Sequence, residues 1–143
     1  MKNRAAFRLG SRLWAGSALL GVAILSLLAA PQLDAAEGAL LGGGLAISQG
    51  AILRVLAVFD VLAGSAILVR PRSYQGLAAA AVAIVSLWLI PRFSRPILMD
   101  FGGFTLDVRV VIFLLEVSVV LAGLTVTAFW LTRNFGTRTG QEP

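Results

Sequence analysis

The sequence predicts an all-α fold, an integral membrane bundle of four helices with both termini in the cytoplasm. Of its 143 residues, 58% are hydrophobic and only 13% are charged, whereas a soluble domain carries about 25% charged residues. Four separate segments are long enough to cross a hydrocarbon core about 30 Å thick as helices. Basic residues gather in alternate connections between these segments. The composition therefore excludes an ordinary cytoplasmic enzyme.

The predicted spans cover residues 13–30, 51–69, 74–90 and 108–131. We expect the first to end at Pro31 and the third at Pro91, because proline interrupts a helix. The rival interpretation of the first span is a signal peptide, but its length of about 18 residues exceeds the usual apolar stretch of 7–15. Residues 1–12 are then a basic cytoplasmic N-terminus, residues 13–131 the membrane domain, and residues 132–143 a cytoplasmic tail.

The direction of the bundle follows from lysine and arginine counts in the short connections. The connection over 31–50 has no basic residue, and the loop over 91–107 has only Arg92 and Arg95. The opposite side has eight, which predicts a multi-pass protein of a bacterial-type inner membrane. These eight are Lys2, Arg4, Arg8, Arg12, Arg70, Arg72, Arg133 and Arg138. Tryptophans near the span ends, at 14, 88 and 130, are typical of the two membrane interfaces.

Two residue types are absent from the sequence, and their absence excludes several functions. The chain has no cysteine and no histidine, so disulfides, thiolate chemistry and imidazole ligands or bases are excluded. No metal site is predicted. Nucleic acid is not an expected partner, because apolar segments separate the basic residues. Whether the protein is an enzyme stays open at this point.

Four charged residues inside the predicted spans form a candidate intramembrane polar site: Arg54, Asp60, Arg109 and Glu116. Placing a charged side chain at the centre of a membrane costs about 2.5–3.5 kcal/mol on insertion scales. We therefore expect each of these residues to have a structural or functional role. Asp60 and Glu116 both lie roughly 13 Å from the same membrane boundary, at 1.5 Å per helical residue. The two arginines lie nearer that boundary, above the carboxylates.

Three interpretations of this candidate site stay open. The carboxylates could share a proton, take protons from a quinol or hold a polar head group. They could be neutral, or bonded to hydroxyls such as those of Ser65, Ser86 or Ser118, and hold the bundle together. They could also pair with a neighbouring subunit.

The loop over 91–107 is too short and too broken by proline and glycine to cross a membrane, yet it is rich in apolar residues. We expect it to lie in the membrane interface, folded over the helix ends. Two interpretations are open: a lid over a lipid-soluble ligand such as a quinone, or a packing or subunit contact. Its candidate ligand or partner residues are Arg92, Phe93, Arg95, Asp100, Phe101 and Phe104.

Small residues should form the helix contacts, since lipid provides no hydrophobic drive for helix association. The expected contact residues are Gly16, Gly21, Gly64 and Ala79.

Three stretches resemble the DoxX-like family of four-helix membrane proteins. They are VFDVLAGSAILVRPRS over 58–73, RPILMDFGGFTLD over 95–107 and LDAAEGALLGGGLA over 33–46. The resemblance implies a four-helix bundle and places Asp60 at the family's acidic second-helix position. Some members resemble the membrane subunit of a thiosulfate:quinone oxidoreductase, and others accompany redox or detoxification systems. The first-helix lysine of several members is missing here, since Lys2 is the only lysine.

The function these observations predict is that of a small, non-catalytic accessory subunit of a larger membrane redox or energy-transducing complex. The alternative is a quinone-reactive subunit of a DoxX-like oxidoreductase, and a small-molecule transporter is third. No covalently bound cofactor is expected, and a quinone is the one cofactor considered. The expected partners are the lipid bilayer and other membrane protein subunits.

Overall fold

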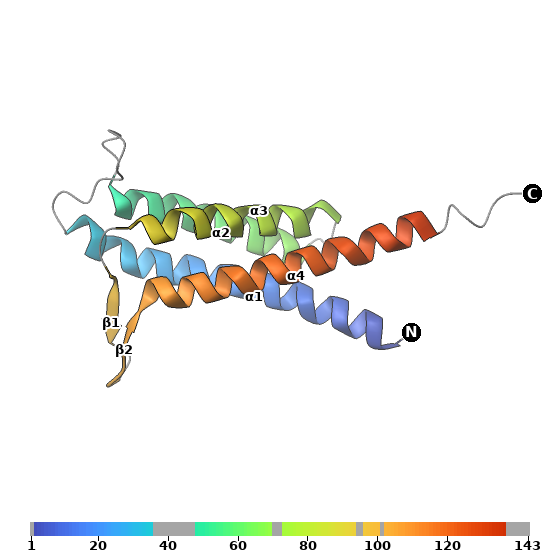
Figure 1. The fold of residues 1–143 in the computed structure, drawn as a ribbon, viewed down its shortest axis with the longest axis horizontal. Coiled ribbons are helices and arrows are strands. Elements are labelled where there is room, and N and C mark those ends of the chain that lie inside the picture. Colours follow the sequence, from blue (N-terminus) through green and yellow to red (C-terminus); the bar gives the residue numbers. More distant parts are fainter. Residues whose placement is uncertain (1, 36–47, 70–72, 94–95, 101, 137–143) are drawn as a thin grey trace, which may run out of the picture.

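The computed structural model describes residues 2–35, 48–69, 73–93, 96–100 and 102–136 of the chain (Figure 1). The four helices confirm the all-α expectation, with one addition, a small β-hairpin. In chain order the elements are α1 (Lys2–Asp34), α2 (Gln49–Val69), α3 (Ser73–Leu89), the 3-10 turn η1 (Ile90–Arg92), β1 (Leu98–Asp100), β2 (Thr105–Asp107) and α4 (Val108–Gly136).

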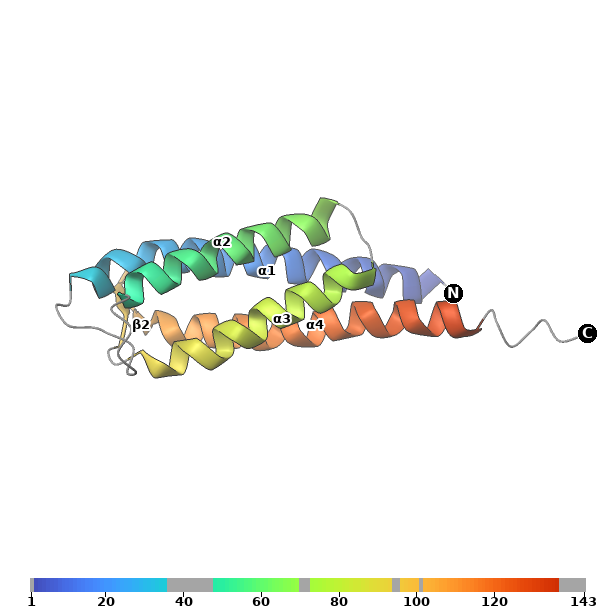
Figure 2. The same cartoon turned by 90° about the horizontal axis from the view of Figure 1, so that it is seen from above.

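The helices form two antiparallel pairs, α1 with α2 and α3 with α4, which lie side by side (Figure 2). The N-terminus of α1 and the C-terminal end of α4 are at one end of the bundle, which we call the terminal end (Figure 1). The two strands are at the opposite end, which we call the hairpin end. Helix α1 also packs along α4, so the two pairs close into a single bundle.

Helix α1 is longer at both ends than the predicted span. It begins at Lys2 and continues through Pro31 to Asp34, so the expectation that Pro31 ends the helix is wrong. Proline removes one backbone donor, but here it lies within the last turn, and its own carbonyl still accepts from the Ala35 amide at 3.1 Å. At the other end, Arg12 donates to the carbonyl oxygens of Ile67, at 2.6 Å, and Leu68, in the last turn of α2. The basic N-terminal segment is therefore continuous with the bundle.

Glycines allow the helices of each pair to approach until their backbones touch. A Cβ atom on Gly64 would lie 3.0 Å from the carbonyl oxygen of Gly16, and one on Gly123 would lie 2.6 Å from that of Gly76. The expected contacts of Gly16 and Gly64 are thus confirmed, and Ala79 is fully buried. The expectation for Gly21 is wrong, because a Cβ there meets nothing within 4 Å.

The interior consists of two apolar clusters with a polar layer between them. Along α2, along α3 with η1, and along α4, one buried polar residue falls between the residues of the two clusters: Asp60, Ser86 and Glu116 respectively. The cluster at the hairpin end contains Val22, Ala29, Ala30, Leu33, Leu53, Ile90, Phe93, Ile97, Val108 and Ile112. The cluster at the terminal end contains Ala15, Ala18, Leu19, Ile67, Ala79, Ala83, Val119 and Ala122.

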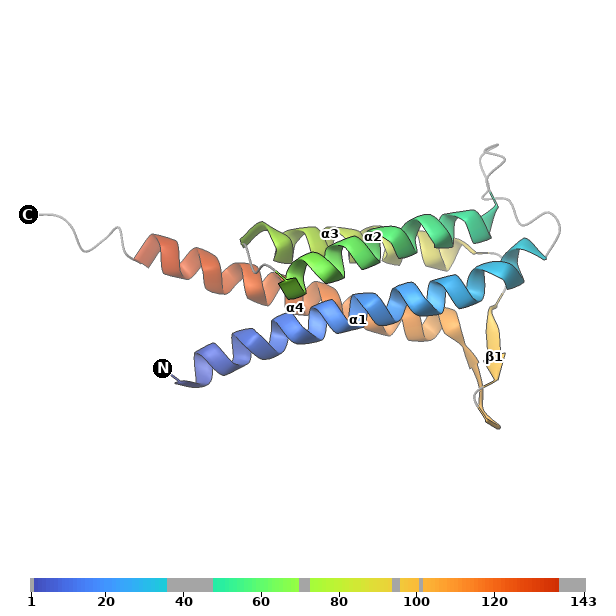
Figure 3. The same ribbon diagram turned by 180° about the vertical axis from the view of Figure 1, so that it is seen from behind.

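The β-hairpin is the part of the fold that the sequence did not predict. Strand β1 pairs antiparallel with β2, with Met99 opposite Leu106. Gly102 and Gly103 have φ values of +63° and +105°, which favour glycine. The hairpin projects sideways from the bundle (Figure 3). It does not fold over the helix ends as expected. Phe93 and Ile97, which precede it, are buried against the core, and Met99 on β1 packs against the same cluster.

The exterior of the bundle is apolar over all four helices. Each is long and apolar enough to cross a membrane, over Ala6–Asp34, Gln49–Val69, Tyr74–Arg92 and Val108–Thr132. Leucine, isoleucine, valine and phenylalanine side chains are exposed along all of them, an arrangement typical of a multi-pass membrane protein whose surface is covered by lipid.

Replacing Gly123 with alanine tests the close contact between α3 and α4. The new Cβ would meet the Gly76 backbone, which cannot rotate away, so the free energy of unfolding should fall by about 1–3 kcal/mol. Gly21→Ala is the matched control: its Cβ enters open space, and alanine is the better helix former, so stability should hold or rise. Unfolding by SDS in mixed micelles, followed by circular dichroism, measures both. Equal stability of the two variants would contradict the described contact.

Candidate functional site

Two carboxyl groups in the middle of the bundle form the centre of the candidate site. Asp60 on α2 and Glu116 on α4 are both 0% exposed, and the two carboxyl groups lie close enough to interact electrostatically. Arg54 is six residues before Asp60 and therefore on a different face of α2; its side chain is exposed. The helical period thus explains why one charged residue of α2 enters the core and the other does not.

The carboxyl oxygens are not satisfied by hydrogen bonds. All four oxygens of Asp60 and Glu116 are buried and have no hydrogen-bond partner among the described residues. The same holds for the hydroxyl of Ser86 on α3, which interacts with the Glu116 carboxyl without reaching hydrogen-bond geometry. Most buried polar groups in proteins have a hydrogen-bond partner. Three buried side chains without one, between the same two apolar clusters, are therefore unusual. We call Asp60, Ser86 and Glu116 the carboxyl layer.

The interpretation that the carboxyls pair with a neighbouring subunit does not fit this burial. A side chain that is fully enclosed by its own chain cannot reach across an interface. Of the three hydroxyls considered from sequence, Ser86 is in the layer. Ser118 instead donates to the Leu115 carbonyl, at 2.6 Å, and accepts from the Trp14 indole nitrogen, at 3.0 Å.

Arg54 does not contribute to the carboxyl layer. Its guanidinium forms an ion pair with Asp34, Nη2 to Oδ2 at 2.5 Å. Asp34 also accepts from the Ser48 hydroxyl at 3.0 Å. These contacts join the end of α1 to the start of α2 at the hairpin end. The four charged residues expected to form one site are therefore divided between the layer and the hairpin end.

Arg109 joins the loop to the start of α4. Its guanidinium binds Asp107 through Nη2–Oδ2 at 2.7 Å and Nε–Oδ1 at 3.1 Å, and Nη1 donates to the Phe93 carbonyl at 3.1 Å. Asp107 Oδ1 also accepts from the Arg109 backbone amide at 3.0 Å and so caps α4. The Arg109 guanidinium holds the pKa of the Asp107 carboxyl below its ordinary value of 3.8.

An open groove of about 300 Å³ lies beside Arg109. It is apolar apart from the Asp107–Arg109 pair, and its lining residues are Ile90, Pro91, Asp107, Arg109, Val110 and Phe113.

The other loop candidates are dispersed. The Arg92 guanidinium stacks on the Trp88 ring, 3.4 Å from its centre. Asp100 accepts from the Gly103 amide at 3.1 Å within the hairpin turn. Phe93 is buried, whereas Phe104 is 76% exposed. Arg95 and Phe101 lie outside the described residues. The described members of this set do not gather around a common point.

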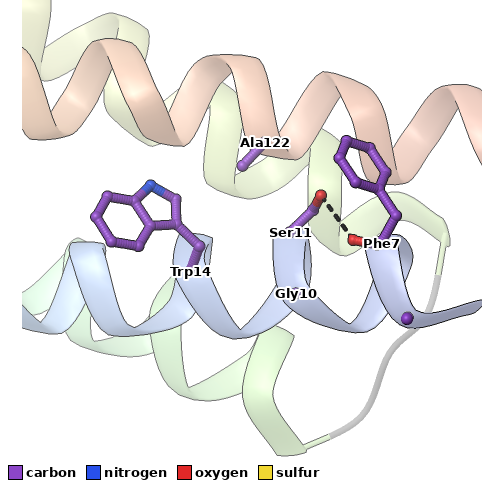
Figure 4. A pocket seen from close by; sticks show the side chains of 6 residues that line it. Phe7, Gly10, Ser11, Trp14 and Ala122 are labelled. Atoms are coloured by element: carbon purple, nitrogen blue, oxygen red, sulfur yellow. Dashed lines mark hydrogen bonds between the residues drawn. The ribbon is translucent and has the colours of Figure 1, made fainter. Parts of the chain in front are cut away.

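Sequence reasoning missed a groove of about 580 Å³ between α1 and α4 at the terminal end (Figure 4). The Phe7 ring meets that of Phe129 edge to face at 6.0 Å, and the Trp14 indole bonds to Ser118. Small residues line the groove between these aromatic rings. The spacing of Phe7, Gly10, Ser11 and Trp14 along one face of α1 is the signal that could have indicated it. The full lining is Ala6, Phe7, Gly10, Ser11, Trp14 and Ala122.

Comparison of the chain with models of protein families finds no match, and comparisons with curated proteins and with solved structures also find none. The resemblance to the DoxX-like family therefore stays a prediction.

Acid should weaken the junction at Asp107. Because the pKa of this carboxyl is lowered in the folded state, its stabilisation is fully present above the ordinary pKa and is lost as the pH falls through the lowered value. At neutral pH, Asp107→Asn should be less stable than the natural protein, and the difference should vanish in acid. Asp100→Asn is the matched control, on the same hairpin but with no arginine partner among the described residues. Thermal unfolding of both variants and the natural protein, from neutral to acid pH, measures these stabilities. A stability difference between the natural protein and Asp107→Asn that does not change with pH would contradict the Asp107–Arg109 pair as its cause.

Proposed function

We propose that the protein is inserted in a bacterial-type inner membrane through its four helices, with both termini cytoplasmic. The apolar exterior supports insertion, and the position of the start of α1 and the end of α4 at the same end of the bundle supports a common side for the two termini. The excess of lysine and arginine in the termini and in the connection over 70–72 supports the cytoplasm as that side. The hairpin end then lies at the opposite membrane surface.

In this membrane the protein acts as a non-catalytic accessory subunit that packs against a larger redox or energy-transducing complex. The observation that carries this proposal is the projecting hairpin. Leu98, Phe104 and Leu106 are exposed on it, and its two strands are three residues long each. A two-stranded hairpin is only marginally stable by itself in water.

The hairpin therefore needs a surface to lie on, and its position beside the bundle leaves it free to contact a neighbour. The Arg109–Asp107 pair fixes the hairpin at its base. The strand pairing places Leu98 and Leu106 on opposite faces, so each face of the hairpin presents an apolar side chain. Such a preorganised apolar element suits a protein interface, because binding then costs little conformational entropy for ordering the hairpin. The DoxX-like resemblance, with its redox-associated members, supports a redox complex as the partner.

The second candidate is a quinone-reactive subunit of the DoxX-like type. The groove beside Arg109 favours it, because it is apolar enough for a quinone ring and contains one strong donor. The carboxyl layer supplies protonatable groups, although the arginines expected above it bind Asp34 and Asp107 instead. Neither carboxyl lines any of the grooves described above, so the geometry does not favour a transporter.

The protein extracted from its native membrane in mild detergent can be used to distinguish the two candidate functions. After gentle detergent extraction, the accessory subunit should migrate on a native gel in a discrete complex with redox subunits at fixed stoichiometry. Phe104→Asp should release it, because a charge at the tip of the hairpin opposes burial, while leaving its thermal stability unchanged. Leu114→Asn, on the exposed face of α4, is the control away from the hairpin. A lone 15 kDa monomer would contradict the accessory function. Co-purified quinone that is lost in Arg109→Gln, which removes the donor of the groove, would favour the second candidate.

A further inference from the structure

The carboxyl layer has the composition of a binding site for a proton. We propose that Asp60 of α2 and Glu116 of α4, together with Ser86 of α3, form a proton-binding site in which the carboxyl pair retains at least one exchangeable proton at neutral pH. The proposal is independent of the accessory function. It rests on burial, on the unsatisfied oxygens and on the charges of the surrounding helices.

Among the described side chains of the surrounding helices, no cation lies beside the two carboxyl groups to neutralise them. Within α1, residues 13–33 contain no charged side chain, and α3 contains none. The nearest arginines in sequence, Arg54 and Arg109, bind Asp34 and Asp107, and Arg12 binds carbonyls of α2. Two adjacent carboxylates in an apolar interior repel one another and also lose their hydration. A retained proton removes at least one of the two charges.

A proton fits the available ligands better than a metal ion does. Among the described residues, no group of three or more acidic, histidine or cysteine side chains gathers in one place. Calcium takes six to eight oxygen ligands and magnesium six, whereas this layer offers two carboxyls and one hydroxyl. A proton needs only one carboxyl oxygen, so these few ligands are enough to hold it.

Ser86 is a positioning residue in this site. It is 1% exposed, its hydroxyl has no other hydrogen-bond partner among the described residues, and it interacts with Glu116. A hydroxyl donor favours the ionised carboxylate. Ser86 is therefore the hydroxyl placed to donate to Glu116 when that carboxyl ionises.

The seam between α2 and α3 offers an apolar approach to the layer. A groove of about 320 Å³ lies there, and residues neighbouring Asp60 and Ser86 in sequence line it, including Phe59 and Val85. All of its lining residues are apolar: Leu56, Phe59, Ala81, Val82 and Val85. A lipid-soluble reagent can enter such a seam from the hydrocarbon, whereas a charged, water-soluble one cannot.

Carbodiimide labelling of the full chain in lipid vesicles tests the proposal, because a carbodiimide adds to a protonated carboxyl. Hydrophobic dicyclohexylcarbodiimide should give one adduct per chain at neutral pH, on Asp60 or Glu116 by peptide mass spectrometry. Labelling should fall as the pH rises and the proton leaves. A charged, water-soluble carbodiimide should modify the exposed Asp100 and leave the layer unmodified.

Two variants and one control variant test the assignment of the adduct to the carboxyl layer. Ser86→Ala should keep the layer labelled to higher pH, because the donor that favours ionisation is gone; a purely structural serine would not move this profile. The double variant Asp60→Asn, Glu116→Gln should abolish the adduct, and Asp100→Asn should not.

Three results would overturn the proposal: no adduct in the folded protein, an adduct yield independent of pH, or protection by sodium at constant pH, which would indicate a metal cation. If the double variant fails to fold, the pH profiles of the natural chain and of Ser86→Ala decide the question.

Discussion

The apolar exterior of the bundle is the constraint on which the rest of the structure depends. Lipid-like surroundings give helices no hydrophobic reason to associate, so their contacts must come from close packing. The backbones of Gly16 and Gly64, and those of Gly76 and Gly123, touch for this reason. These contacts form the two helix pairs, and α1 joins the pairs by packing along α4.

The same constraint governs the charged residues. At the hairpin end, Arg54 and Arg109 each have a carboxylate partner nearby, and these pairs hold the ends of the helices and the loop in place. In the middle of the bundle, Asp60 and Glu116 have no such cation and lie between two apolar clusters. Ion pairs therefore join the helices at the hairpin end, whereas a proton is the simplest means of neutralising the two carboxyl groups in the middle of the bundle.

The spans and the burial of Asp60 and Glu116 were predictable, because hydropathy and the helical period depend on many residues together. Single contacts were not. Pro31 does not end α1, since a proline in the last turn costs only one hydrogen bond. The hairpin escaped notice because three-residue strands show too little alternation to detect. Arg109 was expected above the carboxylates, but its long side chain folds back to Asp107, two residues earlier. This conformation depends on the loop, because the guanidinium also donates to the Phe93 carbonyl.

The membrane topology is the central claim of this account, and the absence of natural cysteines allows a direct measurement. Single cysteines at Asn3, Thr105 and Gln141 can be treated in intact cells with a membrane-impermeant maleimide. The account predicts that only the cysteine at position 105, beside the hairpin tip, reacts before the membrane is permeabilised, and that all three react afterwards. Reaction at position 3 or 141 in intact cells, or protection at position 105, would contradict it.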